Sequence, residues 1–169
     1  MQKKGFLKSN RVVVKDASFR DSLISKGFGE KKDYDLILDL NEALYLIENK
    51  KISIFDENEK KVSFDKLHKK LGKEGPFSYV VFEDLRKKGF VVKTGLKFGF
   101  PFRVYPKGKN PDESHTESVV LIMPQEKNLS MYQFTRASRM ASTVNTKLMI
   151  AVIGSGNDIV YFEVSRKLF

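Results

Sequence analysis

The sequence predicts an α+β protein with a small N-terminal α/β domain (residues 1–76) and a C-terminal mixed α/β domain (residues 77–169) that has a central β-sheet. Segments with helical spacing of apolar residues alternate with short β-rich runs, which is typical of this fold class. Gly75-Pro76 interrupts the pattern near the middle of the chain. With 169 residues, 41% of them hydrophobic, the chain is long enough for two small cores.

The first half contains two expected strands and two expected helices. Residues 11–14 form a β-like run, and a polar segment follows. Apolar residues from 36 to 48 recur at helical spacing, which predicts a helix with Asn41 as the cap of its stronger part. Residues 52–55 predict a strand, and Ser63 is placed to cap a second helix.

The second half begins with an amphipathic helix at 77–88, which ends at Gly89. A helix at 130–145 and a hairpin across the turn Gly154-Ser155-Gly156-Asn157 are also expected. The β-rich runs are residues 90–93, 102–105, 118–123, 148–153 and 159–164.

Composition narrows the classes of function. Cysteine is absent, which removes disulfides and thiolate metal sites. No apolar stretch approaches 18 residues and the first residues lack the apolar region of a signal peptide, so we expect no membrane span and a cytoplasmic location. The formal net charge of +10 favours a polyanionic partner such as nucleic acid, although a merely solvated lysine-rich surface has the same composition.

The sequence motifs give little support for a metal site or a cofactor site. The chain has no phosphate-binding loop and no dinucleotide-binding glycine pattern, and its two histidines cannot form a multi-histidine zinc site. Asp112, Glu113 and Glu117 are candidate ligands for a magnesium ion, but acidic residues in a loop are more often solvated. We therefore expect no metal and no cofactor.

Two residues that flank one polar loop are candidates for catalysis. His115 follows a loop rich in Lys, Gly, Asn and Pro, where an exposed imidazole titrates near neutral pH. Tyr105 ends the strand before that loop. Taken alone, His115 is more often a surface residue and Tyr105 a packing residue, and His68 reads as a surface residue of a lysine-rich helix.

A longer pattern resembles the archaeal tRNA intron endonucleases. The similarity covers roughly residues 35–166 and includes the segments 40–46, 147–152 and 158–162. Its most specific part has Tyr79, Phe82, Leu85-Arg86, Gly89-Phe90, Val92, Gly95, Lys97-Phe98-Gly99, Phe102 and Val104-Tyr105 at the family's spacing. The resemblance implies a tRNA-splicing nuclease, with residues 77–169 as its catalytic domain.

The resemblance also implies a catalytic tyrosine, histidine and lysine, which correspond here to Tyr105, His115 and Lys147. These would act as general base, general acid and electrostatic stabiliser when the RNA 2′-hydroxyl attacks the adjacent phosphate without a metal. An ordinary phenol, with a pKa near 10, is only about one part in a thousand ionised at pH 7, so Tyr105 could instead hold the hydroxyl in place. The family often has one more residue between the lysine and the following strand, and a shift of one position would place Thr146 where the lysine is expected.

For the substrate, the resemblance implies precursor tRNA with a bulge-helix-bulge motif. Two cationic side chains of the family clamp a bulge base; Arg139 corresponds to the first, and Arg166 or its neighbour Lys167 to the second. The family's acidic docking loop corresponds to 154–158, which keeps a single carboxylate.

A chain of this length with one copy of the motif resembles the homotetrameric type, a dimer of dimers. Two other readings stay open: a subunit that needs a different partner chain, and a non-catalytic RNA-binding or structural subunit.

Overall fold

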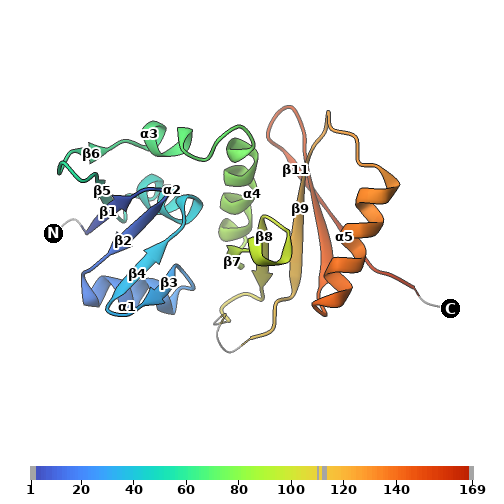
Figure 1. Ribbon diagram of the computed structural model, residues 1–169, viewed down its shortest axis with the longest axis horizontal. Helices are drawn as coiled ribbons and strands as arrows, with labels where there is room; N and C mark the ends of the chain where they lie inside the picture. The colour runs from blue at the N-terminus through green and yellow to red at the C-terminus, as the bar shows by residue number, and fades with distance from the viewer. Residues whose placement is uncertain (1–2, 110, 112–113, 168–169) are drawn as a thin grey trace. The chain divides into compact units, whose positions relative to one another are not determined.

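The computed structural model describes residues 3–109, 111 and 114–167 (Figure 1). The chain divides into two compact units, Met1–Glu83 and Asp84–Phe169. Each unit has its own β-sheet and its own helices, which confirms the α+β fold class. Among the described residues, no helix is long and apolar enough to cross a membrane.

The first unit is built on a six-stranded sheet of order β3-β4-β2-β1-β5-β6, in which only the β1–β5 pair is parallel. Val12, Leu36, Leu44 and Ile54 are fully buried in its core. Its elements are β1 (Lys4–Lys8), β2 (Arg11–Val14), α1 (Ala17–Ser25), β3 (Glu30–Lys32), β4 (Asp35–Leu38), α2 (Leu40–Glu48), β5 (Ser53–Phe55), β6 (Lys61–Val62) and α3 (Phe64–Lys69).

The helix predicted to begin at residue 36 begins four residues later, so the first part of that prediction is wrong. Residues 35–38 form β4. Asp39, and not Asn41, caps α2: its side chain accepts a hydrogen bond from the Glu42 backbone N–H, and Glu42 accepts one from the Asp39 N–H. This reciprocal capping box fixes the start of the helix more firmly than apolar spacing does.

The second unit holds a five-stranded sheet of order β11-β10-β9-β8-β7. Its β9–β10 pair is parallel and is connected through α5, whereas the other neighbouring strands are antiparallel. Helix α4 (Gly75–Lys87) crosses the division between the units. The remaining elements are β7 (Val91–Thr94), the short 3₁₀ helix η1 (Leu96–Phe98), β8 (Phe102–Tyr105), β9 (Ser118–Pro124), α5 (Met131–Thr143), β10 (Lys147–Ile153) and β11 (Ile159–Val164).

Helix α5 covers one face of this sheet (Figure 1). Ser130, where the sequence predicted the helix to begin, caps it through a second capping box with Gln133. The small residues Ala137 and Ala141 of α5 pack against Val119 of β9 and Leu148 of β10. The residues of β9 and β10 on the same side as Val119 and Leu148 therefore face α5. Their neighbours along each strand point to the opposite face of the sheet.

Candidate active site

The strand register brings Tyr105, His115 and Lys147 to one end of the five-stranded sheet. Val104 in β8 pairs with Ser118 in β9, and Ser118 pairs with Lys147 in β10. Tyr105 follows Val104 directly, and His115 precedes Ser118 by three residues. Neighbouring strands are about 4.8 Å apart, so the backbones of Tyr105 and Lys147 are separated by roughly 10 Å. Three residues distant in sequence thus lie in or next to the same end of three adjacent strands.

Tyr105 lies on the α5 face of the sheet. Arg103 pairs with Val119, which faces α5, and Tyr105 is two residues further along the same strand. Its residue is only 4% exposed, yet the described residues provide no hydrogen-bond partner for its hydroxyl. A packed ring whose hydroxyl has no partner among the described residues is a suitable arrangement for a group that positions or deprotonates a substrate hydroxyl.

Arg103 is a residue of this site that the sequence analysis missed. Its guanidinium carbon lies 5.9 Å from the centroid of the Tyr105 ring, and its Nε donates a 3.1 Å hydrogen bond to the carbonyl of Thr94. The hydrogen bond holds a positive charge over the phenol. The signal was available, because residues two apart in a strand share a face.

His115 is exposed, on the segment that leads into β9. Two residues further on, the Glu117 N–H donates a 2.8 Å hydrogen bond to the Val104 carbonyl, which ties this segment to the end of β8. The backbone two residues after His115 is therefore tied to the strand that carries Tyr105, while His115 itself is exposed to solvent. That combination suits a side chain that donates a proton to a bound substrate.

Lys147 leaves the sheet on the opposite face from Tyr105. Leu148 packs against α5, so the preceding side chain points the other way. The Lys147 ammonium forms a 3.0 Å ion pair with Glu163 of β11, and both side chains are more than half exposed. Because Lys147 is the first residue of β10, its side chain can fold round the end of the sheet only if it releases Glu163.

Thr146, the alternative position for the lysine, lies just before β10. Strand alternation assigns it to the same face as Leu148. Its backbone N–H and its hydroxyl donate to the Ala141 carbonyl, at 3.0 and 3.4 Å. A threonine at this position supplies no positive charge, so Lys147 is the basic residue at this end of β10.

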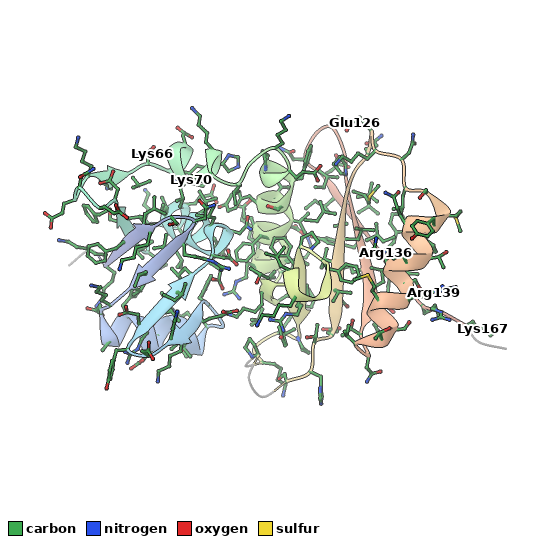
Figure 2. The ribbon with its side chains drawn as sticks, in the orientation of Figure 1. Lys66, Lys70, Glu126, Arg136, Arg139 and Lys167 are labelled. Carbon is green, nitrogen blue, oxygen red and sulfur yellow. The ribbon has the colours of Figure 1, made fainter. Side chains whose placement is uncertain are left out.

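The predicted RNA-clamping cations are all exposed. Arg139 lies on α5, one turn beyond Arg136, and Lys167 follows the end of β11 (Figure 2). Arg166 directly precedes Lys167. Within the part of the chain that the structure describes, the guanidinium of Arg139 has no carboxylate partner. It is therefore available to stack on a base or to pair with a phosphate.

Two of the three acidic residues considered as metal ligands, Asp112 and Glu113, lie outside the described residues. Glu117 is exposed, and its backbone takes part in the sheet. Elsewhere in the described chain, no group of three His, Asp or Glu side chains is placed to hold a metal ion.

Both parts of the chain match a known family of RNA-processing enzymes. Residues 3–68 match the N-terminal domain of the tRNA intron endonucleases, and residues 76–161 match their catalytic C-terminal domain. The chain therefore belongs to the tRNA intron endonuclease family, as the sequence pattern indicated.

Its similarity to individual relatives extends over nearly the whole chain. The tRNA-splicing endonuclease of Pyrococcus furiosus is 34% identical over 168 residues, covering 97% of this chain and 96% of the relative. Those of Methanothermobacter thermautotrophicus and Methanococcus vannielii are each 33% identical, over 166 and 161 residues. They cover 97% and 94% of this chain and 97% and 90% of their own lengths.

Proposed function

We propose that this protein is a tRNA-intron endonuclease that cuts precursor tRNA at bulge-helix-bulge splice sites by metal-independent transesterification. The observation that supports it most is the strand register, which gathers Tyr105, His115 and Lys147 at one end of the β8–β9–β10 sheet. Family membership supports tRNA as the substrate. In this proposal residues 77–169 are the catalytic domain, residues 1–76 are the N-terminal domain, and the enzyme works in the cytoplasm.

The reaction uses a nucleophile that the RNA itself carries. The 2′-oxygen beside the scissile phosphate loses its proton to Tyr105, or is held by Tyr105 while its proton leaves, and forms a bond to phosphorus. The bond from phosphorus to the 5′-oxygen breaks, and the His115 imidazolium protonates that oxygen. The products are a 2′,3′-cyclic phosphate and a 5′-hydroxyl. No water is consumed, which makes the enzyme a lyase.

Stabilising the charged phosphorane requires a cation, and Lys147 is the candidate. Its ammonium must exchange the Glu163 carboxylate for a phosphate oxygen during the reaction. Breaking the Lys147–Glu163 pair costs little free energy, because exposed ion pairs stabilise a protein by only about 0–1 kcal/mol. Arg103 adds a fixed positive charge beside the phenol on the α5 face.

Substrate recognition rests on exposed cations next to this end of the sheet. In the proposal, Arg139 and either Arg166 or Lys167 stack on the two faces of a bulge base. A splice reaction needs two cuts, so we propose a homotetramer, arranged as a dimer of dimers, that presents two active sites at a fixed separation. The alternative is a non-catalytic RNA-binding or structural subunit of a hetero-oligomeric enzyme.

One incubation separates these alternatives. The purified chain is mixed with a bulge-helix-bulge RNA in EDTA, and the ends of any products are determined by treatment with phosphatase and kinase. The proposal predicts cleavage at both bulges, with cyclic phosphate and 5′-hydroxyl ends. Binding without cleavage would favour the non-catalytic alternative, and products with 5′-phosphate ends would contradict the chemistry.

A further inference from the structure

The α5 face of the second unit carries a cavity of about 440 Å³. It lies between α5, the second half of β9, the loop that joins them, and the turn that follows η1. Its floor is apolar and is formed by Phe100, Leu121, Met123, Ala137 and Met140. The volume is in the range of sites for small organic ligands.

Small residues keep this cavity open. Gly99 lines it with φ +73°, a conformation that favours glycine, and a Cβ at this position would meet Met140 Cε at 2.6 Å. Ala137 of α5 contributes only a methyl group to the lining. The cavity therefore exists because Gly99 and Ala137 have little or no side chain, whereas their apolar neighbours are larger.

The rim of the cavity is polar and cationic. It comprises Lys127, Asn128, Gln133 and Arg136, whereas Glu126 of the same loop is absent from the lining. Gln133 Oε1 accepts hydrogen bonds from the Ser130 N–H and hydroxyl at 3.0 and 3.1 Å, which leaves its amide NH₂ group as a donor. The polar residues of the rim thus include Arg136 and the side-chain amides of Asn128 and Gln133.

Arg136 provides the anchoring charge. Its side chain is exposed, and within the described part of the chain no carboxylate pairs with it. It lies one helical turn before Arg139 on α5, and Figure 2 shows both arginines on this helix. The rise between them is about 4.5 Å, which is less than the separation of successive phosphates in an extended strand.

We infer that this cavity receives one unpaired nucleotide of the RNA, with its base on the apolar floor and its phosphate on Arg136. A planar base matches a floor of aromatic and methionine side chains, and its edge groups match the two amides at the rim. A base inside a duplex is stacked on both faces and cannot enter. The cavity is therefore a second base subsite, separate from Arg139, and the inference rests on the proposed function for its substrate.

An abasic scan tests this assignment. Each bulge nucleotide of a bulge-helix-bulge RNA is replaced in turn by an abasic nucleotide, and the dissociation constant is measured for the wild type. Two variants probe the cavity: Asn128→Trp narrows its mouth, and Arg136→Ala removes its charge. Lys70→Ala, which removes an exposed lysine directly after α3 in the first unit, is the control for the loss of one positive charge.

The wild type should lose about tenfold in affinity when one particular bulge base is missing, the size expected for a stacked base. Asn128→Trp should bind the intact RNA about tenfold more weakly and should no longer distinguish it from that abasic RNA. Arg136→Ala should also be weaker than Lys70→Ala. Melting temperatures of all variants identify any that fail to fold.

The inference is overturned if the wild type tolerates every abasic position, or if Asn128→Trp keeps the wild-type profile. Cleavage of the intact RNA by the wild type is measured in parallel. If the wild type cleaves the RNA but the cavity variants show the same affinities for all abasic RNAs as the wild type, the base subsite is refuted and the proposed function is not. If the wild type binds the RNA without cutting it, the proposed function is refuted. The affinities for the abasic RNAs then still show whether the cavity binds a base.

Discussion

Replacing Glu163 by Gln should accelerate RNA cleavage while leaving the fold intact. In the structure the Lys147 ammonium lies 3.0 Å from the Glu163 carboxylate, and their side chains are 55% and 54% exposed. Such a pair stabilises the fold by about 1 kcal/mol at most. If Lys147 must leave Glu163 to reach the phosphate, that free energy is part of the activation barrier. Removing the carboxylate therefore recovers up to about 1 kcal/mol, which corresponds to a rate up to roughly fivefold higher.

The assay is single-turnover cleavage of a labelled bulge-helix-bulge RNA with enzyme in excess, so that product release does not limit the rate. Lys147→Ala should cleave about 10²- to 10³-fold more slowly, the usual cost of losing one preorganised charge stabiliser. Adding Glu163→Gln to Lys147→Ala should change nothing further, because the ammonium that it releases is gone. Asp16→Asn, which breaks the exposed Lys3–Asp16 pair in the first unit, is a matched control and should leave the rate unchanged.

If Lys147→Ala cleaves the RNA at the wild-type rate, this reasoning is refuted and Lys147 has no role in the mechanism. A Glu163→Gln rate equal to that of the wild type, together with a slow Lys147→Ala, would show that the ion pair opens at no cost to the reaction. Adding Thr146→Lys to Lys147→Ala extends the test to the neighbouring position. Recovery of activity would indicate that the site accepts an ammonium from the Tyr105 face of β10.

Three further outcomes are expected. His115→Ala should lose about 10²- to 10⁴-fold in cleavage rate with unchanged RNA affinity, since it removes a proton donor and no binding group; a fully active variant would contradict its role as the acid. Arg139→Ala should weaken RNA binding or the rate at low substrate about tenfold, and equal rates would exclude it from the clamp. The pKa of Tyr161 is raised by burial and, to a smaller extent, by the hydrogen bond that its hydroxyl donates to Asp84. Above pH 10 the folded protein therefore keeps the phenol proton that the unfolded chain loses. Stability should therefore fall as the pH rises above about 10, and Tyr161→Phe should reduce that slope in urea unfolding; identical slopes would contradict the assignment.

Much of the second unit follows from local patterns. Strands 102–105 and 159–164 were predicted with the bounds that the structure has, because turn residues delimit them. The helix predicted over residues 130–145 corresponds to α5, and the Ser130 side chain caps its start. In each case a signal a few residues long determines where the element begins or ends.

The first unit shows where local patterns fail. Leu36 and Leu40 fit a helical period, but Leu36, Leu38 and Leu40 also fit a strand period of two, and sheet pairing with β2 decides between them. Helix α1 was not predicted because it buries only Leu23 among its residues and shows little apolar periodicity. Tertiary partners determine both outcomes.

The candidate site divides in the same way. The register puts Tyr105, His115 and Lys147 near one end of the sheet, and their catalytic roles stay a prediction. The Lys147–Glu163 pair depends on the register of the β10–β11 hairpin, which sequence spacing does not reveal. The Arg103–Tyr105 contact follows from side-chain alternation within β8, so the sequence contained the signal for it.

The nucleophile can be tested on the RNA, without any change to the protein. A bulge-helix-bulge RNA is synthesised with a single 2′-deoxynucleotide on the 5′ side of one scissile phosphate, and cleavage at both bulges is followed. If the 2′-oxygen attacks the phosphate, the substituted site stays intact while the other site is still cut. Cleavage at the substituted site would mean that water or a protein group attacks instead, and the mechanism built on Tyr105, His115 and Lys147 would be wrong.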